Sequence, residues 1–201
     1  MKRMNVIVRG LILGVLLLAA TASILGCGGG VKNEVAVMET DLGTIVLGFY
    51  PDVAPNHVAR FKKLASEGFY DGVQFHRVIP GFVIQGGDPL TKDPNAQRME
   101  YGTGGTGENL DAEFSEIRHK RGTLAMARAQ DPNSGDCQFY IALEALPHLD
   151  GKYTIFGEVL SGLDVVERIA SVETDARDIP ITPVRIESVK IMSKKEAGIE
   201  E

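Results

Sequence analysis

The chain has 201 residues, of which 44% are hydrophobic and 24% are charged, and this composition suits one globular domain with a sizeable core. Its formal net charge of −6 argues against nucleic-acid binding, because phosphates demand a basic face. Its 23 glycines, nine prolines and short β-branched runs favour strands joined by tight turns over a helical bundle.

The first 26 residues predict an export signal. Basic residues come first, and an apolar run follows at residues 11–20, which is too short for a typical transmembrane span. The segment ILGC, which ends at Cys27, and the three glycines after it resemble a bacterial lipobox. By this resemblance residues 1–26 are a lipoprotein signal peptide, Cys27 is the acylated first residue, and residues 27–33 are a flexible tether. An uncleaved anchor or an ordinary signal peptide is the alternative. Either way we expect an exported domain held at a membrane of the cell envelope, on its periplasmic or extracellular face.

The next segments predict a β-hairpin and a helix. Residues 34–40 and 44–50 are β-rich runs joined by Asp41-Leu42-Gly43, which is a hairpin signal. Residues 55–67 carry apolar side chains at helical spacing, with Pro55 suited to the first turn and Gly68 to the stop.

The segment FHRVIPGFVIQGGD, residues 75–88, predicts strand, turn and strand, with the break at Pro80-Gly81. Alternation places Arg77 on one face with Phe75 and Ile79, and places Val83 and Gln85 together on the second strand. If the two strands fold back on each other, a guanidinium, aromatic and aliphatic side chains and a carboxamide converge on one apolar surface. His76 is expected in the core.

Four further strands are expected after this segment, at residues 122–127, 138–142, 154–160 and 183–192. Before the last of them, Ser161 to Asp164 predicts a capping box that opens a short helix with Leu163, Val166 and Ile169 facing inward. With no βαβ rhythm, these elements favour a mainly β domain over residues 34–193, namely a closed eight-stranded antiparallel β-barrel capped by two α-helices. Residues 194–201 form an acidic tail, expected to be frayed.

Other kinds of site find little support in the sequence. The glycines at residues 102–107 lack the Gly-Lys-Ser/Thr ending of a phosphate loop. The four histidines lack paired ligand spacing, and Cys137 lies in a strand-like run without a nearby basic partner, so it is expected to be a packed core thiol. We therefore expect no metal, no cofactor and no hydrolytic nucleophile.

Over about residues 34–193, the sequence resembles the cyclophilin-type peptidyl-prolyl isomerases. The central motif is accompanied, in order, by GTGG at 102–105, LAMA at 124–127, QFYI at 138–141 and LDGKYTIFG at 149–157. The resemblance implies the cyclophilin-like fold and implies Arg77, Gln85 and Phe82 as catalytic residues, with Gln85 contacting the substrate backbone and steadying the arginine. It implies further substrate-binding positions at Val83, Ala127, Arg128, Tyr140, His148, Leu149 and Tyr153.

Two of these positions depart from well-studied relatives, since His148 stands where tryptophan is common and Tyr153 where histidine is common. These departures bear on peptide preference and drug binding and leave the core chemistry intact. The expected function is isomerisation of X-Pro bonds in unfolded or exported proteins by a lipid-anchored monomer that assists folding at the envelope. The alternative is a non-catalytic module or chaperone-like scaffold that binds proline-containing segments of envelope partners.

Overall fold

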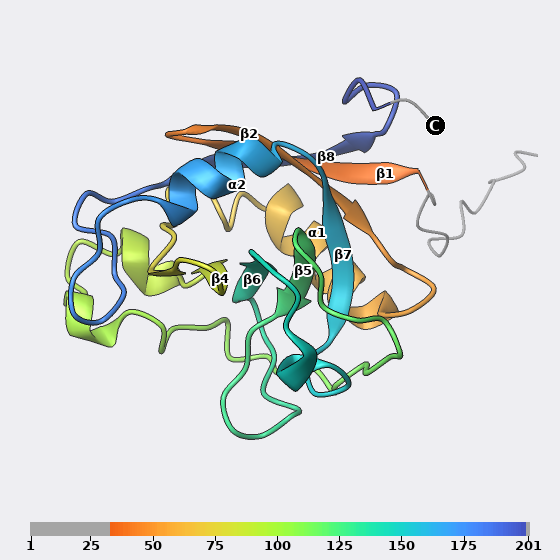
Figure 1. Cartoon of the computed structure of the whole chain (residues 1–201), viewed down its shortest axis with the longest axis horizontal. Helices are drawn as coiled ribbons and strands as arrows, with labels where there is room; N and C mark the ends of the chain where they lie inside the picture. Colours follow the sequence, from red (N-terminus) through yellow and green to blue (C-terminus); the bar gives the residue numbers. More distant parts are fainter. Residues whose placement is uncertain (1–32, 200–201) are drawn as a thin grey trace, which may run out of the picture.

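The computed structural model describes residues 33–199. The predicted signal peptide, Cys27 and nearly all of the predicted tether therefore lie outside the described residues. The described part is mainly β, with eight strands in one antiparallel sheet and two α-helices (Figure 1). The strands are β1 (Glu34–Thr40), β2 (Gly43–Phe49), β3 (Arg77–Ile79), β4 (Val83–Gly86), β5 (Thr123–Met126), β6 (Phe139–Ala142), β7 (Ile155–Ser161) and β8 (Ile186–Ser193). Neither helix within residues 33–199 combines the length and apolar character that crossing a membrane requires.

The predicted β1–β2 hairpin is confirmed. The two strands pair antiparallel with Val35 opposite Gly48 and Thr40 opposite Gly43, so the turn lies at Asp41 and Leu42. Thr40 closes it, because its hydroxyl donates to the Gly43 carbonyl at 2.6 Å and accepts from the Leu42 amide. The hydroxyl thus satisfies polar backbone groups that the turn would otherwise leave unpaired.

The prediction of a closed barrel is wrong, because the sheet is an open half-barrel. Its strand order is β3-β4-β6-β5-β7-β2-β1-β8, and the edge strands β3 and β8 do not pair. In the described chain, the two ends of the sheet are linked mainly through the segments that precede β3 and β8. These segments form one isolated bridge, Gln74 with Arg185, and neighbouring backbone hydrogen bonds such as Phe75 N–H to Val184 O. On the other edge of β3, the Val78 amide donates to the Asp178 carbonyl at 2.8 Å, so this amide is paired with the segment before β8 and not with β8 itself.

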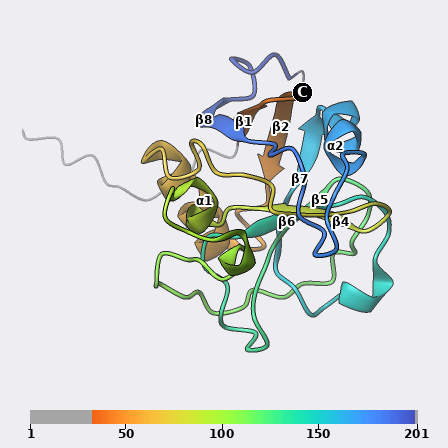
Figure 2. The same ribbon diagram turned by 90° about the vertical axis from the view of Figure 1, so that its left-hand side faces the viewer.

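The two helices contact different strands. Helix α1 (Pro55–Ser66) packs on β7 and β8, whereas α2 (Leu163–Ala170) packs on β2, β3 and β4 (Figure 2). The predicted capping box at Ser161 to Asp164 is wrong. The N-cap is Gly162, with φ 87°, and a Cβ at this position would collide with the Thr44 carbonyl. Because glycine has no side chain, the helix has no side-chain cap hydrogen bond. Val165, Val166 and Ile169 face the core, while Leu163 is only partly buried.

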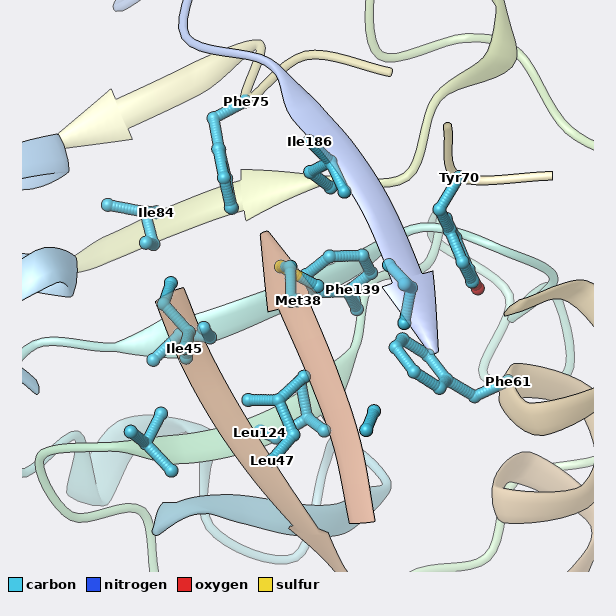
Figure 3. Close-up of a cluster of buried hydrophobic side chains, with 14 of the residues drawn as sticks. Met38, Ile45, Leu47, Phe61, Tyr70, Phe75, Ile84, Leu124, Phe139 and Ile186 are labelled. Carbon is cyan, nitrogen blue, oxygen red and sulfur yellow. The ribbon is translucent and has the colours of Figure 1, made fainter. Parts of the chain in front are cut away.

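The main core joins buried side chains of the sheet with those of both α1 and α2. Figure 3 shows Phe61 reaching from α1 toward the strands, and its ring stacks on Tyr70 and meets Phe139 edge-on at 4.9 and 5.5 Å between centroids. A smaller apolar cluster around Val83, Tyr140 and Ile155 lies apart from this core and forms the base of the pocket described below.

Candidate active site

A pocket of about 100 Å³ opens beside the β3–β4 hairpin, and we call it the apolar pocket after the aromatic and aliphatic side chains that line it together with Arg77, Gln85 and Arg128. Arg77 and Gln85 are opposite partners in the β3–β4 register, and Val83 pairs with Ala142 of β6, so both edges of β4 are fixed by backbone ladders. The pocket is lined by Arg77, Phe82, Val83, Gln85, Ala127, Arg128, Tyr140, Leu149 and Tyr153. Nine of the ten site residues predicted in the described chain therefore gather here.

Arg77 is half-buried at the pocket wall. Its guanidinium carbon lies 5.7 Å from the centre of the Phe82 ring, a distance suited to a cation–π contact. No carboxylate within residues 33–199 forms an ion pair with Arg77. The predicted face of Arg77 is wrong in part, because Phe75 does not share it. Phe75 is buried in the main core with Val78, since β3 begins only at Arg77 and the alternation does not extend back to Phe75.

Gln85 is held by a second glutamine. Its Nε2 donates to Gln138 Oε1 at 3.0 Å, and Gln138 Nε2 in turn donates to the carbonyls of Gly102 and Gly104 at 3.1 and 2.8 Å. Gln85 and Arg77 face each other in register without a hydrogen bond between their side chains in the described structure. The amide chain therefore fixes Gln85 to the glycine loop rather than to the arginine.

The glycine loop itself is anchored by a buried carboxylate. Asp88 is fully buried and accepts from the backbone amides of Leu90, Gly102 and Gly104. Gly104 approaches this carboxylate so closely that any Cβ would overlap Asp88 Oδ1. The GTGG motif is thus a close-approach loop, consistent with the rejection of a phosphate loop.

Tyr140 forms a wall of the pocket and is fixed from behind. Its hydroxyl lies 2.8 Å from His119 Nε2, and Asp150 Oδ1 lies 2.9 Å from His119 Nδ1 and also accepts from the His119 backbone amide. Burial raises the pKa of Tyr140 well above its ordinary value, so the phenol stays protonated. Tyr153 meets the Tyr140 ring edge-on at 5.8 Å between centroids.

His148 lies outside the pocket lining. It is exposed on the short 3₁₀ helix η3 (Pro147–Leu149) and stacks on Phe82, with ring centroids 5.8 Å apart. His148 therefore lies at the rim of the pocket, where it contacts Phe82, which lines the pocket. Leu149, from the same short helix, does line the pocket.

A larger hollow of about 670 Å³ lies beyond Gln85, and we call it the polar cleft. It is lined by Gln85, Gly102, Thr103, Gly104, Gly105, Gly107, Asn109, Ala127, Arg128, Ala129, Ser134, Asp136 and Gln138. Gln85, Ala127 and Arg128 line both hollows and so form the ridge between them. A peptide lying along the Ala127–Arg128 edge would reach both.

Two sequence expectations outside the pocket are confirmed. His76 is buried, and burial lowers the pKa of its imidazole despite the nearby Asp88 carboxylate. Cys137 is a free, fully buried cysteine, and burial raises the pKa of its thiol to about 12, which makes it unreactive. No cluster of three or more potential metal ligands occurs in the part of the chain that the structure describes.

Sequence reasoning missed three residues that support the pocket: Gln138, His119 and Asp150. Gln138 opens the QFYI motif, so its motif could have identified it. Asp150 stands beside Leu149 in another motif. His119 carries no local signal, because its partners lie 21 and 31 residues away in the chain.

Comparisons with known proteins agree on one family. A family model for cyclophilin type peptidyl-prolyl cis-trans isomerase/CLD matches residues 35–191. A peptidyl-prolyl cis-trans isomerase of Schizosaccharomyces pombe is 47% identical over 154 residues, covering 74% of this chain and 93% of its own. One of Synechococcus elongatus is 46% identical over 151 residues, covering 70% and 97%.

Solved structures are similar as well. A Cryptosporidium parvum cyclophilin type peptidyl-prolyl cis-trans isomerase, crystallised in the presence of the dipeptide Ala-Pro, matches with a TM-score of 0.71 and 31% identity over 79% of this chain and 99% of that one. The cyclophilin AquaCyp293 of Hirschia baltica gives a TM-score of 0.63 and 28% identity over 79% and 73%.

Proposed function

This chain belongs to the cyclophilin-type peptidyl-prolyl cis-trans isomerases, and on that premise we propose that the apolar pocket holds the proline ring of the substrate while Arg77 stabilises the twisted X-Pro amide. The observation that supports this assignment is the pairing of a half-buried arginine, free of any carboxylate partner in the described chain, with a pocket walled by Phe82, Val83 and Tyr140. The crystallisation of the Cryptosporidium relative in the presence of Ala-Pro supports a proline-containing ligand.

The chemistry needs no bond cleavage. Rotation of an X-Pro bond loses amide resonance, a barrier of ~18–20 kcal/mol, and the uncatalysed exchange takes tens to hundreds of seconds. In the twisted state the prolyl nitrogen regains a lone pair, which the Arg77 guanidinium can bond, whereas the planar ground state offers no such acceptor. Arg77 is therefore proposed as the catalytic residue.

One hydrogen bond is insufficient by itself. Millisecond turnover requires roughly five decades of acceleration, or about 7 kcal/mol, whereas a charge-assisted bond contributes ~1.5–3 kcal/mol. Exclusion of water and orientation of the amide must supply the rest. For this reason we assign Phe82, Val83, Tyr140 and Leu149 to the proline ring and Gln85, steadied by Gln138, to the substrate backbone.

Proline-limited refolding of an exported protein, catalysed by soluble residues 33–201, tests the assignment. Arg77→Ala should lose at least about 2 kcal/mol of transition-state stabilisation in kcat/KM, with unchanged thermal stability. Arg185→Ala is the matched control, because Arg185 is exposed and does not line the apolar pocket. Near-wild-type activity of a folded Arg77→Ala protein would refute the role of Arg77.

The same experiment separates the alternative function, a non-catalytic module that binds proline-containing segments. A binding module would retain peptide affinity and give no acceleration of refolding in the wild type. The presence of Arg77, Phe82 and Gln85 around one pocket favours the enzyme.

We also propose an envelope location, supported by the lipobox-like ILGC segment and the basic and apolar residues before it. In this reading the enzyme is exported, lipid-anchored through Cys27, and assists folding of exported proteins. Growth with radiolabelled fatty acid should label the wild type and Cys137→Ser but not Cys27→Ser, because Cys27 is the proposed site of acylation. Two or three acyl chains at this residue would anchor the protein stably. Label that persists on Cys27→Ser would contradict the lipoprotein assignment.

A further inference from the structure

We propose that Arg128 makes this enzyme prefer substrates that carry a carboxylate close to the proline, on the side that faces the polar cleft. The inference rests on the proposed function and names the substrate class of the same site. Arg128 belongs to the ridge between the apolar pocket and the polar cleft, so any peptide that fills both must pass it.

The guanidinium of Arg128 is held in one place. Its Nε and Nη2 donate to the Lys152 carbonyl at 3.2 and 2.9 Å, and Nη1 donates to the carbonyls of Ala129 and Gln130 at 2.9 and 3.1 Å. Its carbon lies 4.4 Å from the centre of the Tyr153 ring. These contacts use neutral acceptors, and one of the five guanidinium N–H donors remains for a ligand. The charge is therefore fixed before a substrate arrives, which lowers the entropy cost of binding an anion.

No carboxylate neutralises this charge within residues 33–199. Arg77 and Arg128 are the charged side chains that line the apolar pocket, and both are cations. The polar cleft adds Asp136, but this carboxylate is already bound. It accepts from the Thr106 and Gly107 amides and the Thr106 hydroxyl, and Arg60 lies 3.5 Å away. Arg77 and Arg128 thus carry positive charge beside the apolar pocket without a carboxylate partner in the described residues, in a chain whose formal charge is −6.

The other acidic groups near the site define the direction of the preference. Asp150 is occupied by His119 behind the Tyr140 wall. Glu144 is exposed, and its carboxylate lies near Gly81. Gly81 belongs to the turn between β3 and β4, at the Phe82 end of β4. Arg128 lies with Gln85, at the opposite end of β4. An acidic substrate side chain is therefore favoured on the cleft side of the proline and not on the Glu144 side.

The expected preference is modest, because Arg128 is only partly buried and water screens it. An ion pair of this kind contributes ~0.2–1 kcal/mol, which corresponds to roughly a 1.4- to fivefold change in kcat/KM. The preference should shrink in high salt, since the Debye length is about 3 Å at 1 M ionic strength.

The experiment uses end-capped peptides with one Ala-Pro bond, in which a single residue within three positions of the proline, on either side, is Glu, Gln or Lys. Isomerisation is measured by exchange NMR at low ionic strength. In the wild type, Glu should exceed Gln roughly 1.4- to fivefold at one or more positions on one side of the proline, and Lys should fall below Gln. Arg128→Gln should bring the Glu:Gln ratio to one, and Arg128→Glu should make Lys the preferred residue.

Two further variants serve as controls. Lys190→Glu changes the charge on β8, away from both hollows, and should keep the wild-type ratio. Arg128→Lys keeps the positive charge but loses most of the hydrogen bonds to backbone carbonyls. The variant should therefore still prefer Glu over Gln, even if the protein is less stable. Equal rates for Glu and Gln peptides at all positions in the wild type, or an unchanged ratio in Arg128→Gln, would overturn the proposal. If no peptide is isomerised, the proposed function fails, and the Kd values of the same peptides still decide the role of Arg128.

Discussion

The hydroxyl of Tyr140 lies 2.8 Å from Nε2 of His119, so a wall of the apolar pocket is joined by a hydrogen bond to a histidine that Asp150 holds from the other side. Asp150 is ionised at neutral pH, because backbone and side-chain hydrogen bonds from His119 lower the pKa of its carboxyl. The His119 ring is therefore oriented by Asp150 with a proton on Nδ1, and its Nε2 accepts from the phenol. The aromatic wall is thus fixed by polar groups outside the pocket.

Tyr140→Phe tests this arrangement through stability. Removing the hydroxyl leaves His119 Nε2 buried without a partner, and an unsatisfied buried group costs about 1–3 kcal/mol. Urea denaturation should show that loss. Tyr153→Phe is the matched control, because the Tyr153 ring is half-buried and no hydrogen bond of its hydroxyl is seen in the described chain, and it should change stability by less than about 0.5 kcal/mol. Equal stabilities of the two variants would refute the coupling.

Gln138→Leu should impair catalysis more than folding. The substitution keeps approximate volume but removes the acceptor for Gln85 and both donors to the glycine loop. We expect a loss of about tenfold in kcat/KM, equivalent to about 1.4 kcal/mol, chiefly in kcat because Gln85 is then less well oriented. Steady-state kinetics and thermal unfolding measure the two effects. A normal kcat with a folded variant would show that Gln85 needs no support from Gln138.

The sequence was a good guide to the elements and a poor one to how the sheet ends. The alternation of Val83 and Gln85 and the helical spacing around Phe61 are local patterns, and both are confirmed. Closure depends on whether Arg77–Ile79 pairs with Ile186–Ser193, which are more than 100 residues apart, and no local pattern encodes that pairing. The capping prediction failed because Gly162 is required by its contact with Thr44, another nonlocal cause.

The site shows the same division. Residues that face the pocket lie within motifs, so sequence could indicate them. The residues that hold them, such as His119, act across the fold and become visible only in three dimensions. His148 stacks on Phe82 and does not itself line the apolar pocket, so its role at the substrate stays a prediction.

Glu113→Ala should destabilise the start of α1. The carboxylate accepts from the backbone amides of Asn56 and His57 at 3.1 and 3.0 Å and from His57 Nδ1 at 2.6 Å, and it thereby replaces the missing side-chain cap of this helix. Burial alone would raise the pKa of Glu113, but these hydrogen bonds hold that pKa below its ordinary value. Charge-assisted bonds of this kind contribute about 1.5–3 kcal/mol.

Chemical denaturation at pH 7 measures the loss on Glu113→Ala. Glu116→Ala provides the comparison, because Glu116 is exposed and no hydrogen bond of its carboxylate is seen in the described chain, so it should stay within about 0.5 kcal/mol of wild type. A similar small effect for Glu113→Ala would mean that water caps the helix equally well.

The pH dependence of stability should contain a contribution from His76. Burial lowers the pKa of His76 from its ordinary value near 6.5, with Asp88 opposing the shift, and neither ring nitrogen forms a hydrogen bond in the described chain. The unfolded chain therefore binds a proton at this histidine more readily than the folded chain does. Stability from this group is fully present above pH 6.5 and is lost as the pH falls through 6.5 toward the lower folded pKa. His57 acts in the same direction, because burial also lowers its pKa.

His76→Phe separates the titration from packing. The cost of repacking the buried ring does not depend on pH, whereas the proton linkage does, so the free energy of unfolding should fall less steeply in the variant than in wild type between pH 7.5 and about pH 5.5. Urea denaturation at steps across this range gives both curves. His57 remains in both proteins, so a residual slope is expected in the variant. Parallel curves, offset by a constant, would mean that His76 has the same proton affinity in the folded and unfolded chains, and that its burial does not oppose protonation.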